Sequence, residues 1–176
     1  LSSRDAIIDG KTEAGIYLFE HVEERFADVK TEAGEYLQTW YEYLPEDIVN
    51  GTAQPGTVPL ILALHGGGDD PRQFVDGQGF LELAGREKLA IVAPEKGALH
   101  TTATEGDDFM SKVMPRLVRY MLDTYPALDA SRVYVTGFSM GSLATLRTAY
   151  GAPELFAAAY PQSGIRGAEP TEEDAK

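Results

Sequence analysis

The stretch VYVTGFSMGSLATLRTAYG, residues 133–151, decides the fold class. Its apolar first part is typical of a buried strand, and its second part is typical of a helix that ends at Gly151. Between the two, Ser139 occupies the centre of a G-x-S-x-G pattern. In this context the pattern describes a nucleophile elbow, because the strained turn leaves no room for side chains at Gly137 and Gly141. We therefore predict that Ser139 is a nucleophile. The alternative is a serine in an ordinary turn between a strand and a helix.

Four short apolar runs carry the rest of the fold prediction. Continuous runs of this kind are typical of parallel strands that are buried on both faces of a sheet. Helical patterns separate them, and this alternation implies an α/β fold with a mostly parallel sheet flanked by helices. The runs are VPLILAL (58–64), LAIVAP (89–94), RVYVTGF (132–138) and AAAYPQSG (157–164). The helical patterns are residues 80–89, 107–125 and 142–151, with Asp107 or Asp108 as the expected N-cap of the second and Pro115 as a kink in it.

Residues 1–57 have a different character from the rest of the chain. Asp9-Gly10 and Ala33-Gly34 lie between apolar stretches, as hairpin turns do, so we expect antiparallel strands that extend or flank the sheet. The run EYLQTWYEYL (35–44) is rich in Tyr and Trp and suits a strand. We interpret its aromatic residues as packing; a carbohydrate-stacking strip is the alternative. These residues are Tyr36, Trp40, Tyr41 and Tyr43.

A second motif, LHGGG (64–68), directly follows the run VPLILA. Acyl-transfer hydrolases aim two backbone amides at the oxygen that becomes negative during the reaction. One amide comes from the residue after the nucleophile, here Met140, and the other from a loop such as this one. We assign the second amide to Gly67, with Gly68 as the other candidate. The residues expected to support both motifs are His65, Gly66, Gly137 and Gly141.

Composition limits the classes of partner. The 176 residues include 15 basic and 28 acidic ones, which gives a net charge of −13. Such a surface repels nucleic acid and anionic membranes, and Asp69 and Asp70 after the glycines argue against a phosphate-binding loop. The absence of cysteine excludes disulfides and a cysteine nucleophile. No apolar run approaches the ~20 residues of a membrane span, and the first residues lack the pattern of a signal peptide.

Four segments together resemble a known family. PLILALHGGGDD, DDFMSKVMPRLVRYMLD, LDASRVYVTGFSMGSLATL and PELFAAAYPQSG look like the polyhydroxybutyrate depolymerase and feruloyl or acetylxylan esterase-type group of α/β-hydrolases. The resemblance implies a serine carboxylesterase, often secreted, that acts on polyesters or on esters of plant polysaccharides without a metal or organic cofactor. It also implies one structural domain, in which a β extension (1–57) packs on an incomplete α/β-hydrolase core (58–176). A peptidase or thioesterase of the same fold is the rival enzyme.

The chain departs from this family in its triad. An α/β-hydrolase orders its triad as Ser, then Asp or Glu, then His, yet no histidine follows Ser139. Of the three histidines, His65 belongs to the glycine loop, and His21 is expected to be a surface or packing residue. His100 is the remaining candidate for the base, although a solvated loop histidine is the commoner case. We therefore expect the family's last strands and its triad Asp and His to be missing, which leaves this chain nearly inactive. The alternative is a hydrolase-like binding protein without catalysis.

Overall fold

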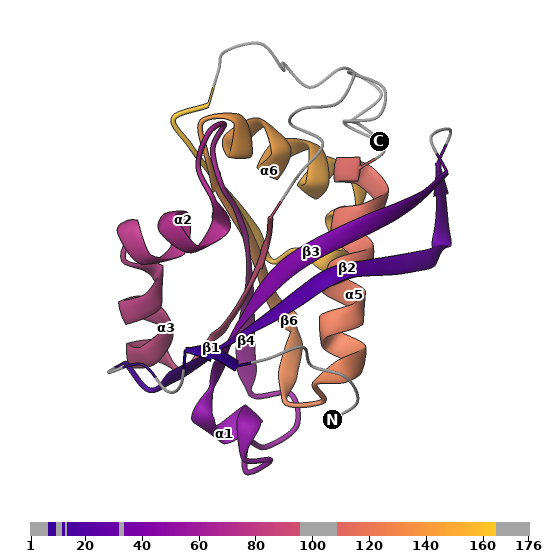
Figure 1. Ribbon diagram of the computed structural model, residues 1–176. Helices are drawn as coiled ribbons and strands as arrows, with labels where there is room; N and C mark the ends of the chain where they lie inside the picture. Colours follow the sequence, from indigo (N-terminus) through magenta and orange to yellow (C-terminus); the bar gives the residue numbers. More distant parts are fainter. Residues whose placement is uncertain (1–6, 10–11, 13, 32–33, 96–108, 165–176) are drawn as a thin grey trace.

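The strands of the described residues form one seven-stranded sheet in the order β1-β2-β3-β5-β4-β6-β7 (Figure 1). The computed structural model describes residues 7–9, 12, 14–31, 34–95 and 109–164. The strands are β1 (Ile7–Asp9), β2 (Ile16–Thr31), β3 (Gly34–Pro45), β4 (Val58–Leu64), β5 (Ala90–Pro94), β6 (Leu128–Phe138) and β7 (Ala158–Gln162). The helical elements are α1 (Glu46–Val49), α2 (Pro71–Gly77), α3 (Phe80–Glu87), the π-helix η2 (Phe109–Val113), α5 (Met114–Thr124), α6 (Met140–Gly151) and the 3₁₀-helix η3 (Pro153–Leu155).

The four apolar runs form the parallel half of this sheet, as predicted. β5 pairs with β4, β4 with β6, and β6 with β7, all in parallel. Every residue of β5 is buried, as are all residues of β4 except Pro59, because helices cover both faces of these strands. β6 begins at Leu128, four residues before the predicted run, and residues 130–132 of that first part are exposed. Polar, exposed strand residues of this kind give no apolar signal in the sequence.

The N-terminal strands continue the same sheet in antiparallel fashion. β1 pairs with β2, β2 with β3, and β3 with β5, so the predicted antiparallel extension joins the parallel half edge to edge. β2 and β3 stay paired as far as Thr31 and Gly34, whereas β3 contacts β5 only from Trp40 to Tyr43. The hairpin therefore projects beyond the sheet (Figure 1). Gly10 and Ala33 of the predicted turns lie outside the described residues, and the division of the chain at residue 57 stays a prediction.

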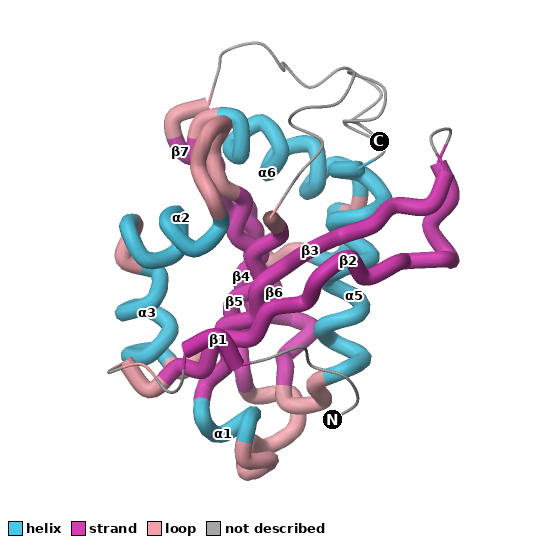
Figure 2. The backbone as a smooth tube through the Cα atoms, viewed as in Figure 1, coloured by secondary structure: helices cyan, strands magenta, loops and turns pink. Residues whose placement is uncertain are grey.

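Helices cover the two faces of the sheet unequally (Figure 2). Phe74 and Val75 of α2 and Ala84 of α3 pack against one face, and the larger cluster around η2, α5 and α6 packs against the other. Side chains alternate along β3, so Trp40 joins the larger cluster and Tyr43 joins the α2 side. Both rings are buried, which confirms packing over a stacking strip for these two residues. No helix among the described residues is long and apolar enough to cross a membrane.

The helix predicted over residues 107–125 begins with irregular geometry. Its first described turn is the π-helix η2, and α5 starts only at Met114. Pro115 is the second residue of α5, but η2 runs directly into α5 through Val113, whose backbone is also helical (φ −73°, ψ −42°). The helical run is therefore continuous across Pro115, and it changes from π to α geometry directly before this proline, which has no N–H to donate. Asp107 and Asp108, the predicted caps, lie outside the described residues.

Gly151 has a different role from the predicted C-cap. It is the last residue of α6, and Ala152 follows as the cap. A Cβ at Gly151 would lie 2.8 Å from the Cα of Ser111 in η2. The sequence therefore has glycine here because α6 and η2 approach each other closely.

Candidate active site

Ser139 stands between the end of β6 and the start of α6, at the carboxyl edge of the parallel strands (Figure 1). Its backbone is strained, with φ 55° and ψ −112°, a conformation that non-glycine residues rarely adopt. Such strain costs about 1–3 kcal/mol and persists only where the surroundings impose it. Ser139 is half-buried, and its hydroxyl forms no hydrogen bond within the part of the chain that the structure describes. The sequence thus places a hydroxyl that has no hydrogen-bond partner among the described residues on a strained strand-to-helix turn.

Two glycines of the motif are required by close packing. A Cβ at Gly137 would lie 2.6 Å from the carbonyl oxygen of Leu64, and one at Gly141 would lie 2.1 Å from the same oxygen. No side chain can occupy either position without moving the end of β4. The turn around Ser139 is therefore fixed against the start of the glycine loop.

The glycine loop reaches the residue that follows the serine. His65 and Gly66 are buried, whereas Gly67 and Gly68 are exposed, and Gly68 has φ 82°. A Cβ at Gly67 would lie 2.5 Å from the Sδ of Met140. The structure thus brings together Gly67 and Met140, the two residues whose amides we assign to the oxyanion. That assignment concerns the direction of N–H groups and stays a prediction.

Both ring nitrogens of His65 contact backbone carbonyl oxygens. Its Nδ1 lies 2.8 Å from the carbonyl oxygen of Gly66, and its Nε2 contacts the carbonyl oxygen of Glu95. Because both ring nitrogens face carbonyl oxygens, the ring offers no lone pair to the Ser139 hydroxyl. His65 instead joins the end of β4 to the end of β5, which suits the supporting role predicted for it. His100, the other candidate base, lies outside the described residues.

His21 belongs to a buried network that the sequence analysis missed. Its ring stacks on Trp40, with centroids 4.6 Å apart, and its Nε2 lies 2.9 Å from Oε1 of Glu42. The carboxylate of Glu42 also accepts hydrogen bonds from Trp40 Nε1, at 3.0 Å, and from the Tyr125 hydroxyl. Burial alone would raise the pKa of Glu42, but the hydrogen bonds from His21, Tyr125 and Trp40 together lower that pKa. The expectation that His21 serves packing is met in this form.

The distance across the sheet separates His21 from the serine. Three strands, β3, β5 and β4, lie between β2 and β6. At ~4.8 Å per strand, the axes of β2 and β6 are about 19 Å apart. His21 therefore cannot act on Ser139 in this arrangement. Glu42 lies two residues after Trp40, so both side chains point to the same face of an otherwise aromatic strand. A charged residue on the face of a buried aromatic ring is the signal that could have revealed the network.

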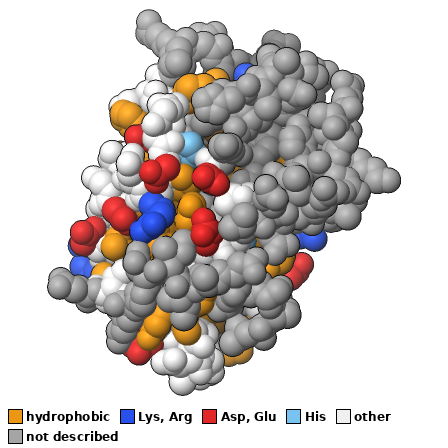
Figure 3. Space-filling view, in the orientation of Figure 1, with side chains coloured by type: hydrophobic (Ala, Val, Ile, Leu, Met, Phe, Trp, Pro, Cys, Tyr) orange, Lys and Arg blue, Asp and Glu red, His pale blue; other side chains and the backbone are white. Residues whose placement is uncertain are grey.

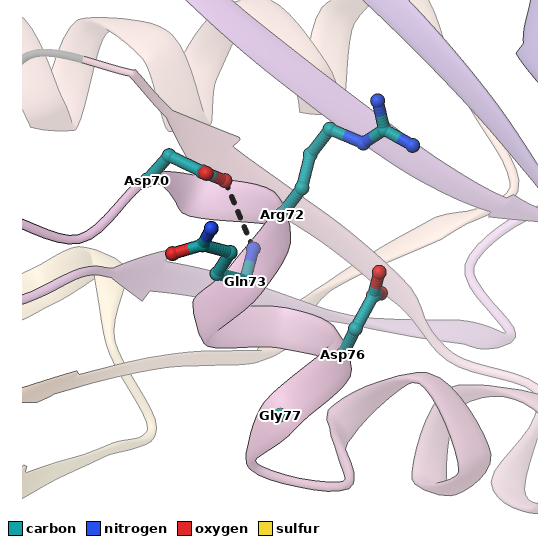
Figure 4. A pocket seen from close by; sticks show the side chains of 5 residues that line it. All are labelled: Asp70, Arg72, Gln73, Asp76 and Gly77. Atoms are coloured by element: carbon teal, nitrogen blue, oxygen red, sulfur yellow. Dashed lines mark hydrogen bonds between the residues drawn. The ribbon is translucent and has the colours of Figure 1, made fainter.

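A shallow cleft of about 460 Å³ follows the glycine loop along the chain (Figure 4). Asp70 caps α2 by accepting a hydrogen bond from the Gln73 amide at 2.9 Å, so it has a structural role in addition to its charge. The side chain of Arg72 extends from the helix toward the neighbouring strands. Acidic side chains gather around basic ones on this face, with hydrophobic side chains between them (Figure 3). The described lining residues are Asp70, Arg72, Gln73, Asp76 and Gly77.

The sheet order and the serine turn are those of an α/β-hydrolase, and comparison with solved structures supports this class. The acetyl xylan esterase from Aspergillus awamori superposes with a TM-score of 0.59 at 21% identity, covering 81% of this chain and 52% of that one. An S-formylglutathione hydrolase from Staphylococcus aureus gives 0.63 at 16% identity, covering 90% and 64%. At these identities the likeness concerns the fold. The chain therefore has the fold of α/β-hydrolase esterases, as the sequence predicted.

Comparison of the sequence with curated proteins finds relatives among ester-cleaving enzymes. Acetylxylan esterase A of Emericella nidulans is 27% identical over 148 residues, or 80% of this chain and 45% of that protein. Poly(3-hydroxyalkanoate) depolymerase C of Paucimonas lemoignei is 29% identical over 122 residues, or 64% and 29%. Feruloyl esterase B of Thermothelomyces thermophilus is 27% identical over 133 residues, or 71% and 43%. No family model matches the chain. The relatives are those expected from the sequence motifs, and the chain spans less than half of their length.

Proposed function

We propose that this chain carries the nucleophile of a serine carboxylesterase. Ser139 attacks the ester carbonyl, the alcohol leaves, and water then hydrolyses the acyl-enzyme to release the acid. The observation that carries this proposal is the strained turn at Ser139, whose hydroxyl has no partner among the described residues. A serine needed only for a tight turn would be relieved of strain by glycine, so its presence here favours a chemical role. The relatives, which bear the names of ester-cleaving enzymes, support the same reaction.

The amides of Met140 and Gly67 hold the negative oxygen in this proposal, with Gly68 as the alternative to Gly67. Met140 is the first residue of α6, so its N–H has no partner within the helix and is available to an anion. Gly67 lies beside it on an exposed part of the loop. One such donor contributes about 10²–10³ in turnover. Neither a metal nor an organic cofactor enters the reaction.

The base of the reaction comes from outside the described residues. Both ring nitrogens of His65 face carbonyl oxygens, and three strands lie between the strand of His21 and that of Ser139. We propose that a triad histidine and its acidic partner belong to a part of the whole protein that this chain lacks. Without them, turnover falls by about 10⁴–10⁶ and leaves roughly 10³ over the reaction in water. His100 is the one candidate within the chain that remains.

For the substrate, we propose acyl esters on plant polysaccharides or polyesters, as the names of the relatives suggest, and secretion of the whole protein. The net charge of −13 makes nucleic acid an unsuitable partner. Amide and thioester substrates distinguish the rival peptidase and thioesterase. The whole protein should cleave acetyl, feruloyl and 3-hydroxybutyryl esters, and it should not cleave the matching amides.

A fluorophosphonate probe tests the nucleophile directly. Intact-mass spectrometry of the whole protein, which supplies the triad histidine, should show one adduct, mapped to Ser139, and Ser139→Ala should abolish it. Ser131→Ala, at an exposed serine of the same strand β6, is the matched control and should label like the unchanged chain. His100→Gln should leave labelling unaltered if the base lies elsewhere. A whole protein that forms no adduct under any of these conditions would favour the binding protein without catalysis.

A further inference from the structure

The serine turn is held from its other side by a residue that the proposed reaction does not use. Gln162, the last residue of β7, accepts a hydrogen bond from the Ser139 amide through its backbone carbonyl, at 2.9 Å. Its side-chain Nε2 lies 2.9 Å from Oγ1 of Thr136 on β6. Thr136 is buried, and its hydroxyl donates to the carbonyl oxygen of Tyr160 at 2.8 Å. One residue thus contacts both the serine and the strand that leads to it.

The direction of these hydrogen bonds is fixed by chemistry. The carbonyl oxygen of Tyr160 can only accept, so the single proton of the Thr136 hydroxyl points to it. Oγ1 must then accept from Gln162, which places the NH₂ group of the carboxamide toward Thr136. A side chain of the same shape without a donor, such as glutamate in its ionised form, cannot make this bond. This position therefore requires the N–H donor of glutamine, and a side chain of the same size without a donor does not suffice.

Strain is concentrated on both sides of this network. Ser139 has φ 55° and Ser163 has φ 52°, and both are non-glycine residues directly after the ends of adjacent strands. After Gln162 the chain turns back toward α6, where a Cβ at Gly164 would lie 2.5 Å from Oγ of Ser142. Conformations of this kind persist only where several interactions impose them. The hydrogen bond from the Ser139 amide to Gln162 is one such interaction, and it acts on the serine itself.

We propose that Gln162 is a positioning residue for the nucleophile. Its bond to Thr136 anchors the end of β7 on β6, and the anchored carbonyl then holds the Ser139 amide. With that amide fixed, the Ser139 hydroxyl and the N–H of Met140 keep their directions above the sheet edge. Loss of the anchor lets the strained turn relax and moves the hydroxyl away from an incoming acyl or phosphonyl group. This inference rests on the proposed role of Ser139.

Gln162→Glu tests the anchor with almost no change of shape. In the whole protein, we expect the second-order rate of fluorophosphonate modification of Ser139 at pH 7 to fall about ten- to a hundred-fold, because small misplacements of reacting groups have effects of this size. Lowering the pH protonates the introduced carboxyl, which can then donate to Thr136. The ratio of the variant's rate to that of the unchanged chain should therefore rise toward one as the pH is lowered from 7 to 4. A purely structural loss of packing would give a ratio that does not depend on pH.

Two further variants and a control complete the experiment. Thr136→Val removes the hydroxyl and should slow modification, whereas Thr136→Ser keeps it and should restore the rate. Gln54→Glu makes the same chemical change at an exposed glutamine in the loop before β4 and should have no effect. Urea unfolding of each variant shows whether it is folded. If Gln162→Glu is not folded, Thr136→Val takes its place in the comparison, and the reverse holds if Thr136→Val is not folded. Equal rates for Gln162→Glu and the unchanged chain would overturn the inference. An unchanged whole protein that is never modified would instead overturn the proposed function, and the inference with it.

Discussion

At the scale of single residues, the candidate site is defined by where side chains are forbidden as much as by where they act. Gly137 and Gly141 are needed because the carbonyl oxygen of Leu64 lies where their Cβ atoms would be. Ser139, in contrast, keeps a side chain in a conformation that glycine would adopt at lower cost. Stability alone would select the opposite residue at that position. Close packing therefore explains Gly137 and Gly141, whereas a chemical role is the better explanation for Ser139.

Gly141→Ala should destabilise the protein by about 3 kcal/mol, because an atom placed 2.1 Å from a backbone oxygen forces β4 and α6 apart. Urea unfolding measures the change. Gly77→Ala is the matched control at the end of α2, where nothing lies within 4 Å of an added Cβ. It should leave stability unchanged or raise it by up to about 1 kcal/mol, since alanine favours helix. Equal effects at the two glycines would mean that the turn is not packed against β4.

The residues of the serine turn and glycine loop could be predicted because each motif encodes its own local geometry. A G-x-S-x-G after an apolar strand specifies a sharp turn without reference to any distant part of the chain. The contact of Gly67 with Met140 follows from the order of parallel strands β4 and β6, which are neighbours. The base could not be predicted, because no motif in the sequence places a histidine beside Ser139. The role of Gln162 was not predicted for a related reason. It depends on the pairing of β7 with β6, and the residue type alone does not indicate this pairing.

At the scale of elements, continuous apolar runs predicted the buried strands correctly, whereas some elements without such a run, α2 and η2 among them, were not predicted. β4, β5 and β7 lie within or close to their predicted runs, because strands buried on both faces must be apolar throughout. α2 escaped prediction because it has only seven residues, too few for a helical spacing of apolar residues to be recognised. Its signal was present in Asp70 and Pro71, an N-cap followed by a proline in the first turn. η2 was not predicted, since no pattern in the sequence specifies π geometry; it packs closely against α6 at Gly151 and directly precedes the turn of α5 that contains Pro115.

The network around Glu42 joins β2, β3 and the end of α5, so its loss should weaken the contact between these elements. We expect Glu42→Gln to lower the free energy of unfolding by about 3 kcal/mol at pH 7, because a buried carboxylate with several donors is replaced by an amide. Glu154→Gln, at an exposed partner of Arg119, is the matched control and should cost less than about 0.5 kcal/mol.

The effect of Glu42→Gln should depend on pH in one direction. The native protein holds the pKa of Glu42 below its ordinary value of 4.5, so the carboxylate contributes fully above that pH. Its contribution is lost as the pH falls through the lower native pKa, where the native carboxylate takes up a proton. Urea unfolding of the variant and the unchanged chain should therefore converge as the pH is lowered from 6 toward 3. A difference that stays constant over this range would show that Glu42 is not ionised in the native state.

At the scale of the whole molecule, the two ends of the sheet differ in how they are covered. The long β2–β3 hairpin lies on one side of the parallel strands, and its buried Trp40 and Glu42 tie it to the helices. On the other side, β7 is the last strand, and its residues 158–161 are exposed. Residues on this first side contact partners that are far apart in sequence, as Glu42 contacts Tyr125. The local pattern of β3 therefore cannot show which distant residues are the partners of Glu42.

An exposed terminal strand can pair with a strand of another molecule. β7 has no charged residue, and the side chain of Tyr160 is 67% exposed. We therefore expect this chain to self-associate as its concentration rises, and Tyr160→Lys to reduce that association, because a charge on an edge strand opposes pairing. Sedimentation velocity over a range of concentrations measures both. Tyr150→Lys is the matched control: Tyr150 is 45% exposed but lies on α6, where no backbone edge is open. If the two variants reduce association equally, exposed aromatic surface drives it; a selective effect at Tyr160 assigns it to the edge of the sheet.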